Sequence, residues 1–349
     1  MKPFVSPFVS VIVPCRNEVA FLGPCLDSIL AGDYPAERME LLVADGGSHD
    51  GTRALAAGYA RRDPRVRVLD NARGITPAGL NLALQHARGD VIARLDGHST
   101  VAADYLSQAV EVLESTGAAN VGGTMLTLTR DRGPFAQPIC VALTSPFGVG
   151  NSRFRTGVKE ISPVDTVFGG CWRREVFSRI GSFNERLERG QDIEFNLRLR
   201  RAGGTILLAP GMVSRYYASA TLKSFCLRNW TNGVWAILPF AYTRGMPVRW
   251  RHLAPLAFVA ALASSGAAAL FRPGPGSRAM ALIAGPYLAV NLVVSLAAAW
   301  RKRSVKLALL LPITFFSLHL SYGAGSLWGT LRLLGELRMT KVLFRQRPA

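Results

Sequence analysis

The first 210 residues alternate between short apolar runs and longer segments in which apolar residues recur at helical spacing. The apolar runs are rich in β-branched residues, and they lie at 9–14, 40–45, 65–70 and 90–96. The segments with helical spacing lie between them, at 20–32, 50–62 and 76–89. Strands separated by helices of this length are joined by right-handed crossovers. The pattern predicts an α/β fold whose mainly parallel sheet is covered by helices on both faces.

The pattern changes after about residue 250, where three long apolar runs follow one another. They cover residues 253–271, 279–300 and 305–329. Each comes close to the ~20 apolar residues that cross a bilayer, with essentially no charge inside. We therefore predict a soluble domain at 1–235, an interfacial linker at 236–252, and a membrane domain at 253–349 with two or three transmembrane helices and a basic tail.

Basic residues flank these runs unevenly. They precede the first run and separate the second from the third: Arg244, Arg249, Arg251, Arg301, Lys302, Arg303 and Lys306. Between the first and second runs, the only charged residues are Arg272 and Arg278. The positive-inside rule then places the N-terminal domain and the 301–306 loop in the cytoplasm.

The basic tail conflicts with three spans, because its residues also favour the cytoplasm. These residues are Arg332, Arg338, Lys341, Arg345 and Arg347. One solution is that the third run is a re-entrant hairpin bent at Pro312 or at Gly323 and Gly325, and this is the interpretation we favour. The other is that the tail is an exception to the rule.

The composition narrows the class of partner. A net charge of +18, from 41 Lys and Arg against 23 Asp and Glu, is compatible with nucleic acid, an acidic membrane surface or an anionic substrate. No zinc-finger, RRM or helix-turn-helix signature accompanies the scattered charge, so we expect no nucleic-acid partner. The five cysteines show no CxxC spacing and are expected to be reduced. The N-terminal apolar run is broken by Pro3 and Pro7, which favours a strand over a signal peptide.

Polar loops follow three of the predicted strands. The first reads PCRNE at 14–18, and the second reads VADGGSHDGT at 43–52. In the second loop, Gly46 and Gly47 allow the backbone to approach a ligand closely. The loop is neither GxGxxG nor a Walker motif, which argues against a dinucleotide oxidoreductase and a P-loop ATPase. Ligands of parallel sheets bind beyond the carboxyl ends of the strands, where these loops meet.

The third loop, Asp96-Gly97-His98, has two explanations. An Asp-Gly pair suits a simple turn. Alternate residues of an extended segment also point the same way, so Asp96 and His98 can reach one ion, and their oxygen and imidazole nitrogen suit Mn²⁺ or Mg²⁺. Such an ion would bridge a diphosphate and stabilise the charge of the leaving group. The neighbouring loops favour the metal site.

Together the three loops resemble family 2 glycosyltransferases with the GT-A fold, whose pattern is a VSVIIPxxNE strand, a DDGSxDGT loop and an Asp-x-Asp motif. The RLDGH form at 94–98 is similar to the succinoglycan branch of that family. The resemblance implies a Rossmann-like nucleotide-diphospho-sugar transferase domain followed by transmembrane helices, with a divalent cation on Asp96 and His98. The residues expected to bind the donor nucleotide are Pro14, Arg16, Glu18, Asp45, Gly47, Asn81 and Asp96.

The segment 168–204 is similar to the acceptor side of the same family, with a Gly-Gly turn and an acidic pair that opens a helix. The pair is Gln191 and Asp192 here, so its Glu is replaced. The resemblance implies that Asp192 is the catalytic base that deprotonates the acceptor hydroxyl. An Asp in the first turn of a helix also stabilises the helix dipole, so this structural role is the alternative.

These expectations combine into one function. The chain is expected to be an inverting, non-processive enzyme of the inner membrane that is multi-pass, with its catalytic domain in the cytoplasm. It would transfer a hexose, with glucose the first expectation, from a UDP-sugar to a polyprenyl-diphosphate-linked saccharide in exopolysaccharide biosynthesis. The alternatives are a polyprenyl-phosphate sugar transferase and a non-catalytic membrane scaffold. A processive synthase is disfavoured because Val234 replaces the Arg of the Gln-x-x-Arg-Trp motif.

Overall fold

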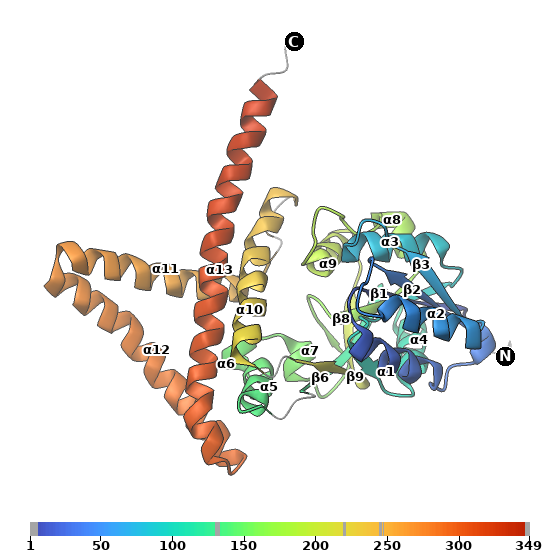
Figure 1. The fold of residues 1–349 in the computed structure, drawn as a ribbon, viewed down its shortest axis with the longest axis horizontal. Coiled ribbons are helices and arrows are strands. Elements are labelled where there is room, and N and C mark those ends of the chain that lie inside the picture. Colours follow the sequence, from blue (N-terminus) through green and yellow to red (C-terminus); the bar gives the residue numbers. More distant parts are fainter. Residues whose placement is uncertain (1–5, 130–132, 219–220, 244–245, 247, 346–349) are drawn as a thin grey trace. The chain divides into compact units, whose positions relative to one another are not determined.

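The computed structural model describes residues 6–129, 133–218, 221–243, 246 and 248–345, and it divides the chain into two compact units (Figure 1). The sheet unit comprises Met1–Leu126 and Arg153–Tyr217. The helical unit comprises Thr127–Ser152 and Ala218–Ala349. The chain therefore passes from the sheet unit into the helical unit at residues 127–152 and then returns to the sheet unit. Arg244 and Arg347, which entered the topology prediction, lie outside the described residues.

The first half of the sheet unit confirms the predicted parallel α/β arrangement. Its strands are β1 (Val9–Cys15), β2 (Met39–Asp45), β3 (Val66–Asp70) and β4 (Val91–Arg94). They alternate with the helices α1 (Val19–Leu30), α2 (Thr52–Arg62) and α3 (Thr76–His86). The strands pair in parallel in the order β3-β2-β1-β4. Their carboxyl ends therefore meet at one edge, as the sequence predicts.

The second half of the same sheet is antiparallel, so the prediction of a mainly parallel sheet holds only up to β4. The further strands are β5 (Ser99–Val101), β6 (Asn120–Leu128), β7 (Ser162–Pro163), β8 (Phe168–Arg173) and β9 (Ile206–Tyr217). The sheet continues from β4 in the order β8-β6-β9-β5, with β7 also paired to β9. The expected Gly-Gly turn lies within β8, where Gly169 and Gly170 both have positive φ.

Helices cover both faces of this sheet. On one face, alternate residues of β1 such as Val11 and Val13 pack against α1 and against α4 (Tyr105–Thr116). On the other, Ile12 packs with α3, α8 (Glu175–Ile180) and α9 (Gln191–Arg201). Trp172 in β8 is 1% exposed and lies edge-on to Phe195 of α9. This aromatic packing fixes the helix that begins next to Asp192.

Three helices of the helical unit are long and apolar enough to cross a membrane: α11 (Trp250–Phe271), α12 (Pro273–Arg301) and α13 (Val305–Arg345). The predicted hairpin in the third run is wrong, because α13 is one continuous helix through Pro312, Gly323 and Gly325. Asn291 Nδ2 of α12 donates a 3.0 Å hydrogen bond to the carbonyl of Pro312, which joins α12 to α13 at the proline.

The glycines of α13 are contact points between helices. A Cβ on Gly325 would overlap with the carbonyl of Trp230 in α10 (Leu222–Ile237), and one on Gly323 would overlap with the carbonyl of Pro255 in α11. Small residues at such positions allow helix backbones to approach closely in membranes. Helix α10 thus belongs to the helical unit, together with residues 127–152. This differs from the predicted boundary at residue 235.

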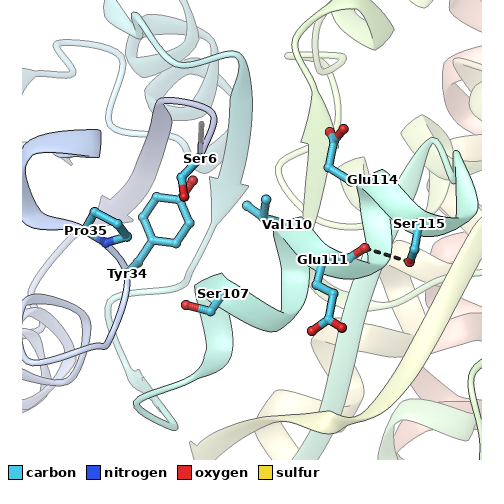
Figure 2. A pocket seen from close by; sticks show the side chains of 8 residues that line it. All are labelled: Ser6, Tyr34, Pro35, Ser107, Val110, Glu111, Glu114 and Ser115. Carbon is cyan, nitrogen blue, oxygen red and sulfur yellow. Dashed lines mark hydrogen bonds between the residues drawn. The ribbon is translucent and has the colours of Figure 1, made fainter. Parts of the chain in front are cut away.

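The amino ends of the strands, opposite the site described below, carry a pocket of about 510 Å³ (Figure 2). Tyr34 lies at its wall, and its hydroxyl donates a 2.5 Å hydrogen bond to the carbonyl of Pro7. Glu114, on the last turn of α4, forms a 2.9 Å ion pair with Arg173. The polar groups around this pocket thus tie the amino ends of the sheet to neighbouring segments.

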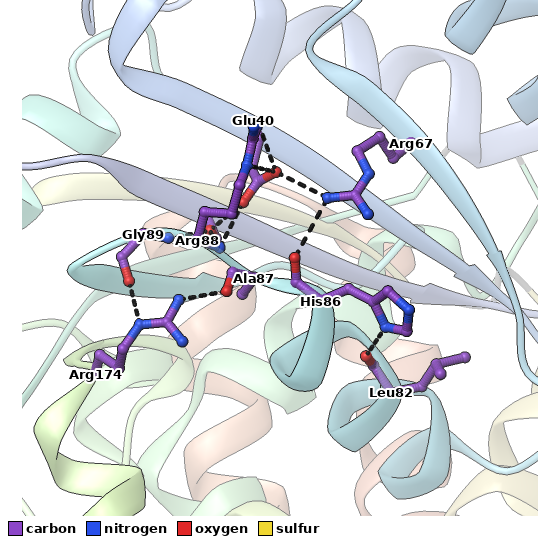
Figure 3. Close-up of polar contacts among 9 residues, drawn as sticks. Glu40, Arg67, Leu82, His86, Ala87, Arg88, Gly89 and Arg174 are labelled. Atoms are coloured by element: carbon purple, nitrogen blue, oxygen red, sulfur yellow. Dashed lines mark hydrogen bonds and ion pairs between the residues drawn. The ribbon is translucent and has the colours of Figure 1, made fainter.

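A buried carboxylate also stabilises the amino ends (Figure 3). Glu40 in β2 is 0% exposed, and its Oε1 accepts hydrogen bonds from Ser10 Oγ (2.7 Å) and from the backbone N–H of Arg88 (2.7 Å). Its Oε2 pairs with the guanidinium groups of Arg88 and Arg67. Burial alone would raise the pKa of Glu40, but the hydrogen bonds from Ser10 and Arg88 and the charge of Arg88 lower it below its ordinary value. The folded protein therefore favours the ionised form.

We expect Glu40→Gln to lower the free energy of unfolding by about 1–3 kcal/mol at pH 7, because buried charged hydrogen bonds are lost. A lowered folded-state pKa stabilises the protein above the unfolded value of 4.5, and that contribution is lost as the pH falls through the folded value. The difference between variant and wild type should therefore shrink below about pH 4.5. Urea unfolding in detergent measures it. Glu37→Gln, an exposed neighbour, is the control, and an equal loss in both variants would contradict the assignment.

Candidate active site

The loops after β1 and β2 are joined by hydrogen bonds between their backbones and side chains. The backbone N–H of Asn17 donates to Ser48 Oγ (2.9 Å), and Asn17 Oδ1 accepts from the N–H of His49 (2.9 Å). The N–H of Glu18 donates to Thr52 Oγ1 (2.8 Å). Asn17 has a positive φ of 55°, which Asn tolerates better than most residues. These bonds hold both loops in one place at the carboxyl edge.

Asp45 is buried at the end of β2 and shapes the glycine turn that follows. Its Oδ1 accepts a 2.5 Å hydrogen bond from Ser48 Oγ, and its Oδ2 accepts one from the N–H of Ser48 (3.3 Å). Gly47 has a φ of 73°, and no heavy atom lies within 4 Å of a Cβ built on it. The turn therefore leaves open space next to its backbone. Arg16 Nη1 donates to the carbonyl of Gly74 (3.1 Å), which brings the loop after β3 to the same edge.

Arg94 and Asp96 form an ion pair at the end of β4. Arg94 is 6% exposed, and its Nε and Nη2 donate to the same oxygen of Asp96, Oδ1, at 3.1 and 2.9 Å. The third nitrogen, Nη1, is buried without a hydrogen-bond partner in the described part of the chain. A buried guanidinium is costly to leave unpaired, so Arg94 fixes the position of Asp96.

Neighbouring charges shift the pKa values of both members of this pair. Burial would raise the pKa of Asp96, but the charges of Arg94 and His98 lower it below its ordinary value. Burial would lower the pKa of Arg94, but Asp96 and then Asp192 raise it. The charge of Asp192 therefore favours the protonated form of Arg94. The sequence reasoning did not single out Arg94, although a charged residue in a buried strand was a usable signal.

His98 is held by Glu18, which was expected to contact the nucleotide. The His98 Nδ1 and Glu18 Oε1 atoms are 2.8 Å apart. A Cβ on Gly97 would overlap with the other oxygen of Glu18, Oε2. The carboxylate therefore lies directly over Gly97 while it bonds to His98. A carboxylate behind one ring nitrogen orients a histidine so that the other nitrogen can bind a metal.

The sequence reasoning missed Tyr216, which lies beside His98, and Arg155, which lies over the Tyr216 ring. The ring of Tyr216, in β9, lies edge-on to the His98 ring with 5.5 Å between centroids. The guanidinium of Arg155, in α7 (Arg153–Thr156), lies 5.5 Å from the centroid of the same Tyr216 ring. His98 and the Arg155 guanidinium thus contact the same Tyr216 ring. Such a position suits the recognition of an anionic group.

The acceptor-side residues lie at the start of α9. Asp192 is half-buried in the first turn of that helix, after Gly190, which has a φ of 75°. Gln191 is buried, and its Oε1 has no hydrogen-bond partner among the described residues. Glu194 is 6% exposed and is paired with Arg198 at 2.7 Å. Glu194 thus forms a salt bridge within α9, whereas Asp192 forms none with the described residues of this helix.

Asn81 was expected to bind the nucleotide, but its amide has other partners. Its Nδ2 donates to the carbonyl of Phe183 (2.9 Å) and its Oδ1 accepts from the N–H of Phe183 (2.9 Å). The Nδ2 also bonds to Glu185 Oε1 (2.8 Å). Asn81 therefore attaches the segment before α9 to α3. Pro14 is buried within β1 and contributes backbone only.

The residues present fit a metal ion that substrate completes. Among the described residues, no three His, Cys, Asp or Glu side chains are grouped as a full set of ligands. Mg²⁺ and similar cations commonly take only one or two protein ligands and fill the remaining positions with substrate phosphates and water. Asp96 and His98 match that donor set. Thiol chemistry is a poor fit, because burial and then the charge of Asp45 raise the pKa of Cys15 to about 12.

Comparison with known proteins first defines the fold. The solved structure of the mannosyltransferase PcManGT from Pyrobaculum calidifontis, in complex with GDP-Man and Mn²⁺, matches with a TM-score of 0.60 and 21% identity, over 93% of this chain and 88% of that one. The mixed sheet with acidic loops at its carboxyl edge is therefore a GT-A domain.

The sequence comparisons then define the family. The family model "Glycosyl transferase family 2" matches residues 10–181. The succinoglycan biosynthesis protein ExoA of Rhizobium meliloti is 31% identical over 72% of this chain and 77% of its own length. Glycosyltransferase AglE of Haloferax volcanii is 27% identical over 66% of this chain and 75% of its own length. The chain belongs to glycosyltransferase family 2, and it is a glycosyltransferase.

The contact between Gly97 and Glu18 can be tested with a double-mutant cycle. We expect Gly97→Ala to lower the free energy of unfolding by about 1–3 kcal/mol, because the added methyl displaces the Glu18 carboxylate. In a Glu18→Ala background that clash is absent, so the same substitution should cost much less. Thermal unfolding in detergent of the four proteins gives the coupling. Additive effects would show that Glu18 does not occupy the space above Gly97.

Proposed function

We propose that this glycosyltransferase is an inverting, non-processive enzyme. It transfers a hexose, glucose in the first instance, from a UDP-sugar to a polyprenyl-diphosphate-linked saccharide during exopolysaccharide assembly. The observation that carries the proposal is the buried Arg94, which pairs with Asp96 and senses the charge of Asp192. Arg94 forms an ion pair with the proposed donor-side carboxylate, Asp96, and the charge of the proposed acceptor-side carboxylate, Asp192, also raises the pKa of Arg94.

The donor would bind across the loops after β1, β2 and β4. The open backbone at Gly47 and the neighbouring Arg16 and Asp45 are the groups proposed to bind the nucleoside. Asp96 and His98 would hold Mn²⁺ or Mg²⁺, and that ion supplies a positive charge for the diphosphate leaving group. The role of Glu18 in this proposal is to orient His98 and not to bind the nucleoside directly.

The acceptor would react by a single displacement. Its hydroxyl oxygen forms a bond to the anomeric carbon while the bond from that carbon to the diphosphate oxygen breaks. The electron pair leaves with the diphosphate, and the hydroxyl proton passes to Asp192. Attack opposite the leaving group inverts the anomeric configuration. Glu194 is a weaker candidate for the base because Arg198 occupies its carboxylate.

A lipid-linked acceptor agrees with the helical unit. A substrate attached to a polyprenyl chain stays at the membrane surface, where helices α11 to α13 would keep the enzyme. One relative, the dolichyl N-acetyl-alpha-D-glucosaminyl phosphate 3-beta-D-2,3-diacetamido-2,3-dideoxy-beta-D-glucuronosyltransferase of Methanococcus voltae, is 26% identical over 62% of this chain and 69% of its own length. We propose an inner-membrane, multi-pass protein with the sheet unit in the cytoplasm, because the 301–306 loop is strongly basic.

Transfer of radiolabelled sugar from a panel of UDP- and GDP-sugars into a membrane lipid extract tests this function. We expect label from UDP-glucose in a lipid-diphosphate saccharide. Label on polyprenyl phosphate itself would favour the alternative transferase. Label in long polymer would indicate a processive synthase. No transfer from any donor, by protein that is folded, would contradict enzymatic activity with these substrates.

The metal site predicts different outcomes for its two ligands. Asp96→Ala should nearly abolish transfer, whereas His98→Ala should raise the Mn²⁺ concentration needed for half-maximal rate. Calorimetric titration of Mn²⁺ in the presence of UDP should show a loss of affinity in His98→Ala and a loss of about 10–100-fold in Glu18→Ala, because Glu18 orients the ligand. Unchanged Mn²⁺ binding in both variants would leave His98 as a turn residue.

The acceptor base predicts a separation of binding from transfer. Asp192→Asn keeps the size of the side chain and loses the proton acceptor, so transfer should fall by about 10²–10⁴. UDP-sugar affinity, measured by calorimetry, should change little because Asp192 lies on the acceptor side. Glu194→Gln is the matched control, and it should keep most of the transfer rate if the protein remains folded. Near-normal transfer in Asp192→Asn would place the base elsewhere.

A further inference from the structure

A segment of the chain outside the three long apolar helices is built like a membrane element. It covers residues 133–152, and it carries no Asp, Glu, Lys, Arg or His. It contains α5 (Ala136–Thr144) and α6 (Pro146–Val149), joined at Ser145. Although β6 precedes it and β7 follows it, it belongs to the helical unit. A charge-free stretch of 20 residues can enter an apolar environment without burying an ionised side chain.

The segment is attached to the middle of α13. His319 Nε2 donates a 3.0 Å hydrogen bond to the carbonyl of Phe147, and the hydroxyl of Tyr287 in α12 bonds to His319 Nδ1 at 2.9 Å. The Phe147 ring lies edge-on to Phe315, with 4.9 Å between centroids, and edge-on to His319 at 5.0 Å. Segment, α12 and α13 therefore share one packed cluster.

The position of His319 sets the depth of this cluster if α13 spans the bilayer. The apolar part of α13, Val305–Gly335, has 31 residues. A bilayer core takes about 20 helical residues. Every 20-residue stretch within Val305–Gly335 contains His319. In each such stretch, His319 lies roughly 5 Å or more along the helix axis from the nearer end of the stretch, at ~1.5 Å per residue. Phe147, bonded to His319, would then lie inside the hydrocarbon region.

The backbone of the segment is prepared for such an environment. Irregular backbone is tolerated at membrane depth only where its polar groups are satisfied within the protein. At the α5–α6 junction, Ser145 Oγ accepts from the N–H of Phe147 (3.3 Å), and the Ser145 carbonyl accepts from the N–H groups of Gly148 and Val149. Thr144 Oγ1 donates to the carbonyl of Cys140 (2.8 Å). The carbonyl of Phe147 is taken by His319.

We infer that residues 133–152 form a re-entrant element that inserts α5 and α6 into the lipid beside α13. The partner of this surface is the acyl-chain region of the bilayer. The inference rests on the proposed membrane anchorage by α13, but it adds a second point at which the chain enters the membrane, in the middle of the catalytic sequence. The sheet is then attached to the membrane through both 127–152 and the chain after residue 217.

Cys140 provides a native probe within α5. Cys15, Cys25 and Cys171 are buried, so a nitroxide spin label on Cys140 needs only the change Cys226→Ser. The full chain is reconstituted in phosphatidylcholine and phosphatidylglycerol vesicles. Power saturation then compares collisions with oxygen, which partitions into lipid, and with Ni-EDDA, which stays in water. Matched labels are placed by Leu309→Cys, which is 67% exposed on α13, and by Glu37→Cys on the sheet unit, both in a Cys140→Ser and Cys226→Ser background.

We expect the ratio of oxygen to Ni-EDDA collisions at Cys140 to approach that at Leu309→Cys and to exceed that at Glu37→Cys several-fold. A ratio equal to that at Glu37→Cys would overturn the re-entrant element. If Leu309→Cys itself resembles Glu37→Cys, the anchorage by α13 fails, and this inference falls with it. If the label at Cys140 is protected from both reagents, the measurement is repeated with a label at Leu143→Cys. Protection at both positions means that α5 is buried in protein, which also overturns contact with lipid.

Discussion

The ion pair of Arg94 and Asp96 is the interaction on which the arrangement of the site depends. The pair lies where the sheet changes from parallel to antiparallel, because β4 has β1 on one side and β8 on the other. Gly169 makes this junction possible, since a Cβ there would lie 2.6 Å from the carbonyl oxygen of Arg94. A buried guanidinium needs a carboxylate, so the end of β4 is fixed before any ligand binds. The loop after β4 is thereby held by one buried charge.

The parallel half of the fold could be predicted from sequence because its signals are local. Each strand is one apolar run, each helix follows directly, and the spacing dictates the crossover. The antiparallel half lacks such signals. Strand β8 reads FGGCWR and β7 has two residues, so neither gives an apolar alternation. Their places in the sheet are set by pairing with distant strands, which the apolar pattern of one short segment cannot reveal.

The meeting of the three loops was predicted for the same reason. Asp45, Asp96 and the loop of Glu18 meet because the ends of parallel strands meet. The partner of Glu18 was missed, since His98 lies 80 residues away in sequence. Gly323 and Gly325 led to the wrong prediction of a hairpin in the third apolar run. A glycine within an apolar run can break a helix or allow another helix to approach, and only the neighbouring Pro255 and Trp230 decide between these outcomes.

The pairing of β5 with β9 has a consequence for biosynthesis. Ser99, the residue after His98, lies opposite Tyr216. A ribosome makes β1 to β4 and their helices first, and these contacts are close in sequence and quick to form. The loop that carries His98 gains its neighbouring strand only after more than a hundred further residues have been added. Until β8 has been made, β4 presents an open edge to other chains, and β5 does so until β9 has been made. The order of synthesis therefore leaves the candidate site incomplete until the last strand of the sheet has been made, and a chain stalled before residue 217 would be exposed to aggregation there.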